Sequence, residues 1–242
     1  MSKKLMLLAA GALSVLAFTA LPSGAVAGEP HIKCEKFPCT YNVAGGQTRF
    51  SELAGGTVWC EKTEGNGAIT ESATEPTKAA KESTTGWVEL TFTGCKEQSV
   101  FHFSCTGTGK EEPTGQVKTG TLITHNIYLN HAKQQGVLLT NILTTFTCAG
   151  GFARSTVTGN VIGELHETEC NKATKIIKQN FKLKEEKHGE QLWKHITGTG
   201  TTYDLITATN HNTTPSETTG YQTAAQTGTG TLTFNQNVTP TC

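Results

Sequence analysis

The stretch that most constrains this chain is an alternation of apolar and polar side chains between positions 87 and 109. The apolar members are Val88, Leu90 and Phe92, followed after a polar turn by Phe101, Phe103 and Cys105. Successive side chains of a strand point to opposite faces, so this pattern is typical of half-buried β-strands. We therefore expect residues 87–109 to form the central hairpin of a β domain.

The rest of the chain repeats this theme in short segments rich in threonine and glycine. β-Branched threonine suits strand positions, and glycine suits turns and bulges. Residues 136–148 are the most continuously apolar part, and their threonines favour two buried strands or one bent strand over a helix. Gly159 lies where a strand would bulge or bend. These patterns predict an all-β fold, an antiparallel β-sandwich or barrel of many short strands, stabilised by disulfides.

The first 27 residues have the parts of a secretory signal peptide. Two lysines precede an apolar run over Leu5–Leu21, and Ala25-Val26-Ala27 forms an A-x-A cleavage site. A transmembrane anchor is the alternative, but the run is short for a bilayer span and contains Ser14 and Thr19. Gly28 is not cysteine, which argues against a lipid anchor. We expect a secreted, extracellular protein that is soluble and has no membrane as a partner after cleavage.

Beyond the signal peptide we expect two parts. Residues 28–54 are predicted to be a loosely structured N-terminal segment, and residues 55–242 a single β domain. Without Lys3 and Lys4, 18 basic residues oppose 20 acidic ones. This balance argues against nucleic-acid binding, which needs a basic face.

All eight cysteines lie after the predicted cleavage site. They are Cys34, Cys39, Cys60, Cys95, Cys105, Cys148, Cys170 and Cys242. An even number in an exported chain predicts four disulfides, and the absence of any C-x-x-C makes a metal site the poorer interpretation. Spacing alone leaves about 105 arrangements open.

Candidate catalytic and metal-binding residues are few. Asp204 is the only aspartate, the spacing of the glutamates marks no acid–base pair, and no G-x-S-x-G motif occurs. His166-Glu167-Thr168-Glu169-Cys170 matches half of a zinc motif, but Cys170 replaces the second histidine. His125 and His131 flank a turn and are more typical of solvated loop histidines. We expect no catalytic, metal or cofactor-binding residues and no cofactor.

Two surface features suggest partners. Seven lysines between Lys172 and Lys194 form a basic patch that could contact anionic cell-wall polymer or polysaccharide. Protection of an edge strand is the favoured interpretation of these lysines. Six aromatic residues are candidates for a ligand platform, although each is more typical of a core: Trp59, Trp87, Trp193, Tyr128, Tyr203 and Tyr221.

Three segments between about Gly55 and Leu183 stand out: V-E-L-T-F-T-G-C, T-F-T-C and V-T-G-N-V-I-G-E-L. Over this range and on these segments, the chain resembles a family of uncharacterised secreted proteins that are numerous in soil actinobacteria. The resemblance implies export and a β-rich fold, and it carries no functional residues over.

The resemblance also implies a disulfide pairing. Cys60, Cys95, Cys105 and Cys148 match the cysteine positions of the family, and the other four are extra. Pairing the extra cysteines among themselves gives Cys34–Cys39 and Cys170–Cys242, and we expect Cys95–Cys105 and Cys60–Cys148 for the rest. A regular hairpin conflicts with Cys95–Cys105, because one cysteine would lie at its tip and the other at its base.

These observations favour a non-catalytic extracellular or cell-surface binding or structural β domain. The alternative is a secreted hydrolase that acts on carbohydrate with glutamates. Convergence of two glutamates, or of a glutamate and a histidine, on a concave pocket would distinguish the hydrolase.

Overall fold

The structure is a computed structural model. It describes residues 30–52, 57–72, 75–79, 82–98, 100–109, 112–129, 134–151, 153–166, 169–182, 192, 207–212 and 218–241. The predicted signal peptide lies outside the described residues.

The described residues form seventeen strands and one 3₁₀ turn. The strands are β1 (His31–Cys34), β2 (Thr40–Gly45), β3 (Thr48–Glu52), β4 (Thr57–Cys60), β5 (Lys62–Ser72), β6 (Glu75–Ala79), β7 (Glu82–Ser83), β8 (Thr85–Thr93), β9 (Lys96–Glu97), β10 (Cys105–Gly107), β11 (Val117–Lys118), β12 (Leu122–Tyr128), β13 (Gln135–Cys148), β14 (Ala153–His166), β15 (Thr174–Phe181), β16 (Thr207–Asn212) and β17 (Thr218–Thr241). The turn Ala149–Gly151 joins β13 to β14.

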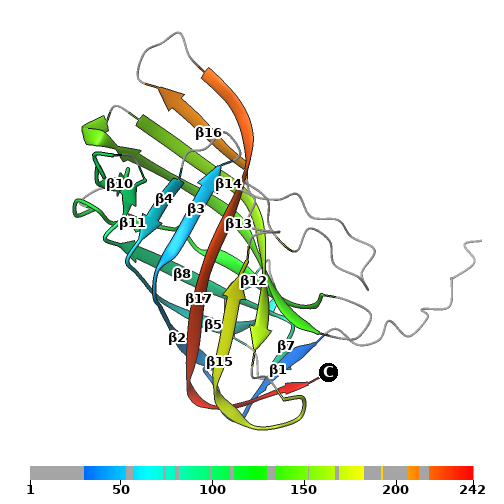
Figure 1. The fold of residues 1–242 in the computed structure, drawn as a ribbon. Coiled ribbons are helices and arrows are strands. Elements are labelled where there is room, and N and C mark those ends of the chain that lie inside the picture. Colours follow the sequence, from blue (N-terminus) through cyan, green and yellow to red (C-terminus); the bar gives the residue numbers. More distant parts are fainter. Residues whose placement is uncertain are drawn as a thin grey trace, which may run out of the picture.

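Eight of these strands close into an antiparallel barrel, which confirms the all-β prediction and selects the barrel over the sandwich. The pairing order is β2, β5, β8, β12, β13, β14, β15, β17 and back to β2. Figure 1 shows these strands in the lower part of the molecule. We call this circuit the lower ring.

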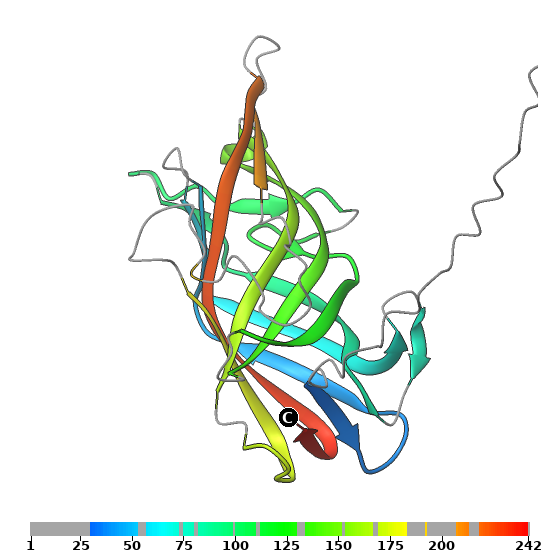
Figure 2. The same ribbon diagram turned by 90° about the vertical axis from the view of Figure 1, so that its right-hand side faces the viewer.

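The outer strands extend the barrel into a second circuit, the upper ring. The first half of β17 pairs with β3, and β3 continues through β4 to β9. A bridge between Lys96 and Ser104 joins β9 to the β10 side, and β10 pairs with β13. The circuit returns through β14 and β16 to β17. The long strands β13, β14 and β17 therefore belong to both rings, and Figures 1 and 2 show them running the height of the barrel.

A β-bulge in β13 marks the passage from one ring to the other. The register with β14 shifts between Leu139 and Ile142, where Asn141 has φ 63° and Gly159 has φ 113°. The extra residue reverses the alternation, so Leu139 and Ile142 both face the interior while Leu143 faces solvent and is 64% exposed. Residues 136–148 therefore form one bent strand, which is one of the two arrangements expected for them, and the bulge or bend expected at Gly159 is confirmed.

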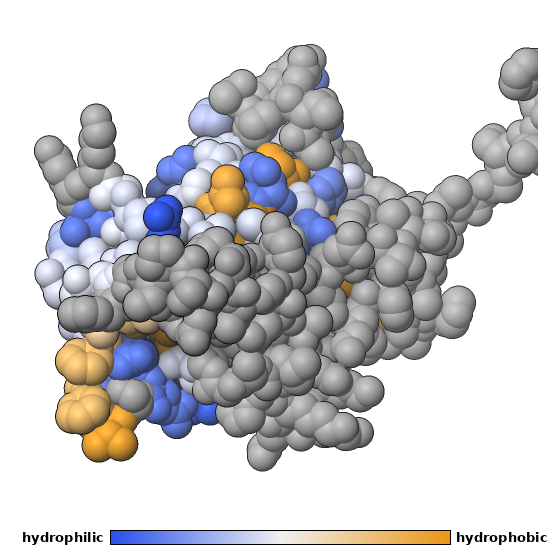
Figure 3. Space-filling view, turned by 90° about the horizontal axis from the view of Figure 1, so that it is seen from above, coloured by the Kyte–Doolittle hydropathy of each residue, from blue (hydrophilic) through white to orange (hydrophobic). Residues whose placement is uncertain are grey.

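The main core fills the inside of both rings, and a smaller apolar cluster lies outside the barrel. The outer cluster consists of Ile127, Leu129, Leu138 and Ile162. Leu138 is buried on the face opposite Val137 and Leu139, which belong to the main core. The outward face of β13 is therefore apolar near this end of the strand. Among the described residues that are visible from above, most are polar, and apolar ones reach the surface in a few places (Figure 3).

The predicted hairpin over 87–109 is wrong in its second half. The first strand is confirmed as β8, but its partners are β5, β11 and β12. Phe101 and Phe103 lie in a loop and are exposed, because His102 between them has φ 49° and interrupts the extended chain. Alternation alone does not distinguish a strand from such a loop.

Three further sequence expectations are corrected by the strand pairing. Residues 28–54 contain β1, β2 and β3, so this segment is part of the barrel and is not loosely structured. Gly65-Asn66-Gly67, a sequence typical of a turn, lies inside β5 between β2 and β8. Lys178 does not protect an edge, because this part of β15 pairs with β14 on one side and β17 on the other.

The cysteine pairing is partly as expected. The structure confirms Cys34–Cys39. The pairs Cys95–Cys105 and Cys60–Cys148 are wrong, and the observed bonds are Cys60–Cys95 and Cys105–Cys148. Cys170 is also disulfide-bonded, and its expected partner Cys242 lies outside the described residues.

Strand register explains these bonds. Cys105 and Cys148 are direct partners across β10 and β13, with their Cα atoms 4.1 Å apart. Cys60 and Cys95 are 3.9 Å apart because β4 pairs with β9 on one side of them and β5 pairs with β8 on the other. Cross-strand neighbours have the short Cα separation that a disulfide requires.

Candidate functional site

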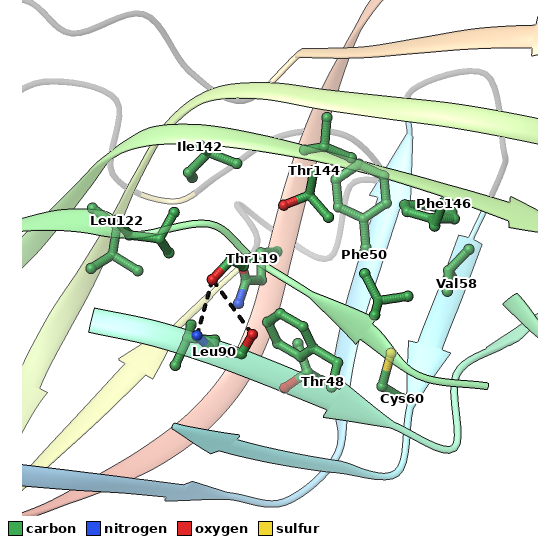
Figure 4. A pocket seen from close by; sticks show the side chains of 15 residues that line it. Thr48, Phe50, Val58, Cys60, Leu90, Thr119, Leu122, Ile142, Thr144 and Phe146 are labelled. Atoms are coloured by element: carbon green, nitrogen blue, oxygen red, sulfur yellow. Dashed lines mark hydrogen bonds between the residues drawn. The ribbon is translucent and has the colours of Figure 1, made fainter. Parts of the chain in front are cut away.

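An apolar cavity inside the upper ring is the main candidate site. Its volume is about 80 Å³, and it is lined by side chains from β3, β4, β8, β13, β14 and β17 and from the β11–β12 segment. Eleven of the fifteen lining residues are apolar, and four are polar: Thr48, Thr119, Thr144 and Gln226. Figure 4 shows these side chains converging from opposite walls of the barrel.

The alternation of each strand places these side chains inside. On β8, Leu90 and Phe92 face the cavity while Glu89 between them is exposed. On the facing wall, Phe146 of β13 meets Phe50 of β3 edge to face, with ring centroids 6.3 Å apart. Aromatic pairs prefer this geometry, and both rings line the cavity.

The polar groups of the cavity differ in how they are hydrogen-bonded. The Thr48 and Thr63 hydroxyls are 2.7 Å apart and bond to each other. The backbone N–H of Leu90 donates to the Thr119 hydroxyl at 3.0 Å (Figure 4). The Thr144 hydroxyl is buried and has no hydrogen-bond partner among the described residues. Thr144 therefore offers a bound molecule one polar contact in an otherwise apolar wall.

A second, smaller cavity of about 30 Å³ lies inside the lower ring. Leu90 and Leu139 line both cavities, so they form the boundary between them. Tyr41 lines the second cavity, and its hydroxyl donates to the Trp87 carbonyl at 3.0 Å. Burial raises the pKa of Tyr41 well above its usual value, and this outweighs a hydrogen bond with Thr124 that lowers the pKa. Tyr41 is therefore neutral at physiological pH.

The described lining of the two cavities offers no group for acid–base chemistry near neutral pH. Among the described lining residues there is no carboxylate, lysine, arginine or histidine, and Cys60 is held in a disulfide. General acids and bases need a titratable group within hydrogen-bond reach of the substrate. What these described residues can do is surround an apolar group.

A carboxylate and a histidine do meet elsewhere, on the outer face of β14. The Glu164 carboxylate lies 3.0 Å from His166 Nε2 and 2.6 Å from Lys182 Nζ, and it is buried. Leu165 between Glu164 and His166 faces the second cavity, so both of these side chains point away from it. We interpret the cluster as an ion pair that fixes β15 against β14.

The other sequence-selected residues do not assemble a site. Cys170 is disulfide-bonded and is no zinc ligand, and no group of three or more potential metal ligands occurs in the described part of the chain. His125 Nε2 lies 3.5 Å from the Thr140 hydroxyl, while His131 is outside the described residues. Tyr128 is buried and Trp87 is half-buried.

The lysines and the remaining aromatics are similarly dispersed. Lys172 pairs with Glu169, and Lys182 with Glu164. Half-buried Trp59 lies beneath the Lys96 ammonium, 5.4 Å from it. Trp193 and Tyr203, like the lysines beyond position 182, lie outside the described residues, and nothing is described of the Tyr221 side chain.

The cavity could not be predicted from the sequence, since its described lining comes from seven segments spread between positions 48 and 226. The residues that make it are ordinary inward positions of strands. Only the alternation of β8 indicates part of the lining, because it predicts that Leu90 and Phe92 share a buried face.

Among the described residues, no helix is long and apolar enough to cross a membrane. Comparisons with family models, with curated proteins and with solved structures found no match.

Proposed function

We propose that this chain is a secreted, non-catalytic extracellular protein that binds a slender apolar molecule inside its barrel. The observation that carries the proposal is the cavity of the upper ring, which is lined mainly by apolar side chains and has no titratable group among its described lining residues. Small-molecule sites are typically apolar with a few polar groups that fix orientation. Thr144 supplies such a group.

The dimensions of the cavities indicate the shape of the ligand. About 80 Å³ and about 30 Å³ are too small for a bulky ring system, but the two spaces adjoin at Leu90 and Leu139. A straight hydrocarbon chain with a hydroxyl or carbonyl at one end fits this arrangement. Eight-stranded barrels are wide enough to hold one small ligand.

Export is supported by the leader sequence and by the disulfides. Disulfides form and persist in oxidising compartments, and the structure contains three between described cysteines. The hydrolase alternative has less support. It needs carboxylates that converge on a pocket, and Glu164 and His166 line none of the barrel cavities described above.

The proposal is tested by titrating the oxidised protein with 1-butanol, 1-hexanol and 1-octanol in a calorimeter. Each added methylene buried should strengthen binding by roughly fourfold, since burying one is worth about 0.8 kcal/mol. Cyclooctanol, which has the same number of carbons as octanol but a wider shape, should not bind.

Neighbouring residues of β13 provide a matched pair of variants. Ile142→Phe places a larger side chain in the cavity and should weaken octanol binding about tenfold, whereas Leu143→Phe on the outer wall should leave binding unchanged. Equal binding by both variants, or binding that does not depend on chain length, would contradict the proposal.

A further inference from the structure

The loop between β9 and β10 exposes the most apolar surface of the described residues. Val100 is 91% exposed, Phe101 75% and Phe103 43%. The two phenylalanine rings stack with their centroids 5.5 Å apart, so they present one continuous apolar face. We call Val100, Phe101 and Phe103 the apolar tip.

The base of the loop is held firmly. The Glu97 N–H donates to the Phe103 carbonyl at 3.0 Å, and the Cys105 N–H donates to the Cys95 carbonyl at 2.9 Å. Cys95 and Cys105 are each in a disulfide, which fixes them to β4 and β13 respectively. Because the base is fixed, the loop loses little conformational entropy when the apolar tip binds a partner. The fold therefore holds the tip in an exposed position.

The size and shape of the tip argue against another protein as its partner. Stable protein interfaces bury about 800 Å² on each side around an apolar centre with a polar rim. Three side chains on one loop are far smaller than this, so a second copy of the chain would not be held.

The residues beneath the tip suit the boundary between lipid and water. The Lys96 ammonium lies over the Trp59 ring at 5.4 Å and pairs with Glu61 at 3.3 Å. Lys96 is also the bridge partner of Ser104, so this pair lies directly at the base of the loop. Tryptophan and lysine are the side chains that combine an apolar body with a polar end and favour the headgroup region.

We propose that the apolar tip inserts into the surface of a lipid bilayer and gives the protein weak, reversible membrane association. Val100 and the two phenylalanines enter the acyl boundary, while Trp59 and Lys96 remain at the headgroups. This inference goes beyond the proposed binding of a ligand in the barrel and does not depend on it.

The test is flotation of the protein with vesicles of phosphatidylcholine, alone or with phosphatidylglycerol. The chain from Gly28 onward is used, because the apolar run Leu5–Leu21 would itself enter lipid. We expect both vesicle types to carry the protein, since the tip has no charge. Replacing the tip by V100S, F101S and F103S together should reduce the bound fraction about tenfold or more, because each phenylalanine contributes apolar area.

Leu143→Ser is the matched control, since Leu143 is an exposed apolar residue on the barrel wall and its loss should leave flotation unchanged. In a second measurement, the fluorescence of the tryptophan in a Phe101→Trp variant should shift to shorter wavelength when vesicles are added. Brominated lipid should quench this fluorescence. No flotation of the unmodified protein with either vesicle would overturn the proposal. So would equal flotation of the triple variant when its unfolding midpoint matches that of the unmodified protein.

Discussion

Tyr41 packs inside the lower ring, and its burial there raises the pKa of its side chain. Its ring packs against Phe234, with centroids 5.1 Å apart, and its hydroxyl reaches the Trp87 carbonyl. The ring fits because Gly67 lies beside it: a Cβ on Gly67 would be 2.5 Å from Tyr41 Cζ and 2.3 Å from the Trp87 oxygen. Gly67 therefore serves close packing inside a strand, although its sequence context is typical of a turn.

The raised pKa of Tyr41 predicts a loss of stability in alkali. Above pH 10 the unfolded chain releases the tyrosine proton while the folded chain retains it, so the free energy of unfolding falls by about 1.4 kcal/mol per pH unit. Below pH 10 both states are protonated and this contribution is fully present. Tyr41→Phe should lower the free energy of unfolding by about 1 kcal/mol at pH 7, because the hydrogen bond is lost. Above pH 10 the free energy of unfolding of this variant should fall less steeply than that of the unmodified protein.

Urea unfolding between pH 7 and pH 11.5 measures both effects. Burial also raises the pKa of Tyr128, and that residue is present in both proteins, so the difference between the two slopes isolates Tyr41. Parallel slopes would show that Tyr41 ionises in the folded state as it does in the unfolded one.

At the scale of elements, the disulfides record which strands are neighbours. The chain places Cys95 and Cys105 ten residues apart, yet the structure bonds each to a different strand. The hairpin that would have joined them is replaced by the loop with the apolar tip. An alternating sequence thus predicted a strand correctly for β8 and wrongly for residues 101–104.

Disulfide removal should cost stability according to the loop that each bond closes. The Cys105–Cys148 bond spans 43 residues and Cys34–Cys39 spans 5. Chain entropy gives about 4 kcal/mol for the first and about 2 kcal/mol for the second, so Cys105→Ala with Cys148→Ala should be the more damaging double variant.

Chemical denaturation of the two double variants checks this order, and peptide mapping without reduction checks the connectivity. Mapping should recover a peptide pair that contains Cys60 and Cys95. Recovery of Cys95 with Cys105 would contradict the strand register of the upper ring.

The whole molecule is built from two stacked rings that share three long strands. β13, β14 and β17 contribute to both circuits, and the bulge between Leu139 and Ile142 keeps apolar side chains facing inward along the full length of β13. Without the bulge, Leu143 would face the interior and Ile142 would face solvent. The apolar lining of the upper-ring cavity depends on this reversal of the side-chain alternation in β13.

Shared strands predict a single cooperative unfolding transition. Neither ring can close without β13, β14 and β17, so loss of one removes the pairing partners of the other. Scanning calorimetry of the oxidised protein should give equal calorimetric and van't Hoff enthalpies. Two transitions, or fluorescence and circular dichroism curves that do not coincide, would show that the rings unfold independently.

The sequence by itself determined the class of fold, the strand β8 and the extended character of residues 136–148, for which it left two strands or one bent strand open. These depend on the period of two along an extended chain and on the β-branched side chains, which are local properties. It also predicted Cys34–Cys39, where the two cysteines are only five positions apart.

Only the tertiary structure decided how the ring closes, which cysteines meet across strands, and which inward side chains enclose a cavity. These features depend on register between strands that are far apart in the chain, and register is set by the whole packed core. The alternating stretch 87–109 illustrates both cases. Its first half forms β8, a strand of the barrel wall. Phe101 and Phe103 alternate in the same way but are exposed in a loop, because β8 pairs with β5, β11 and β12 and not with them.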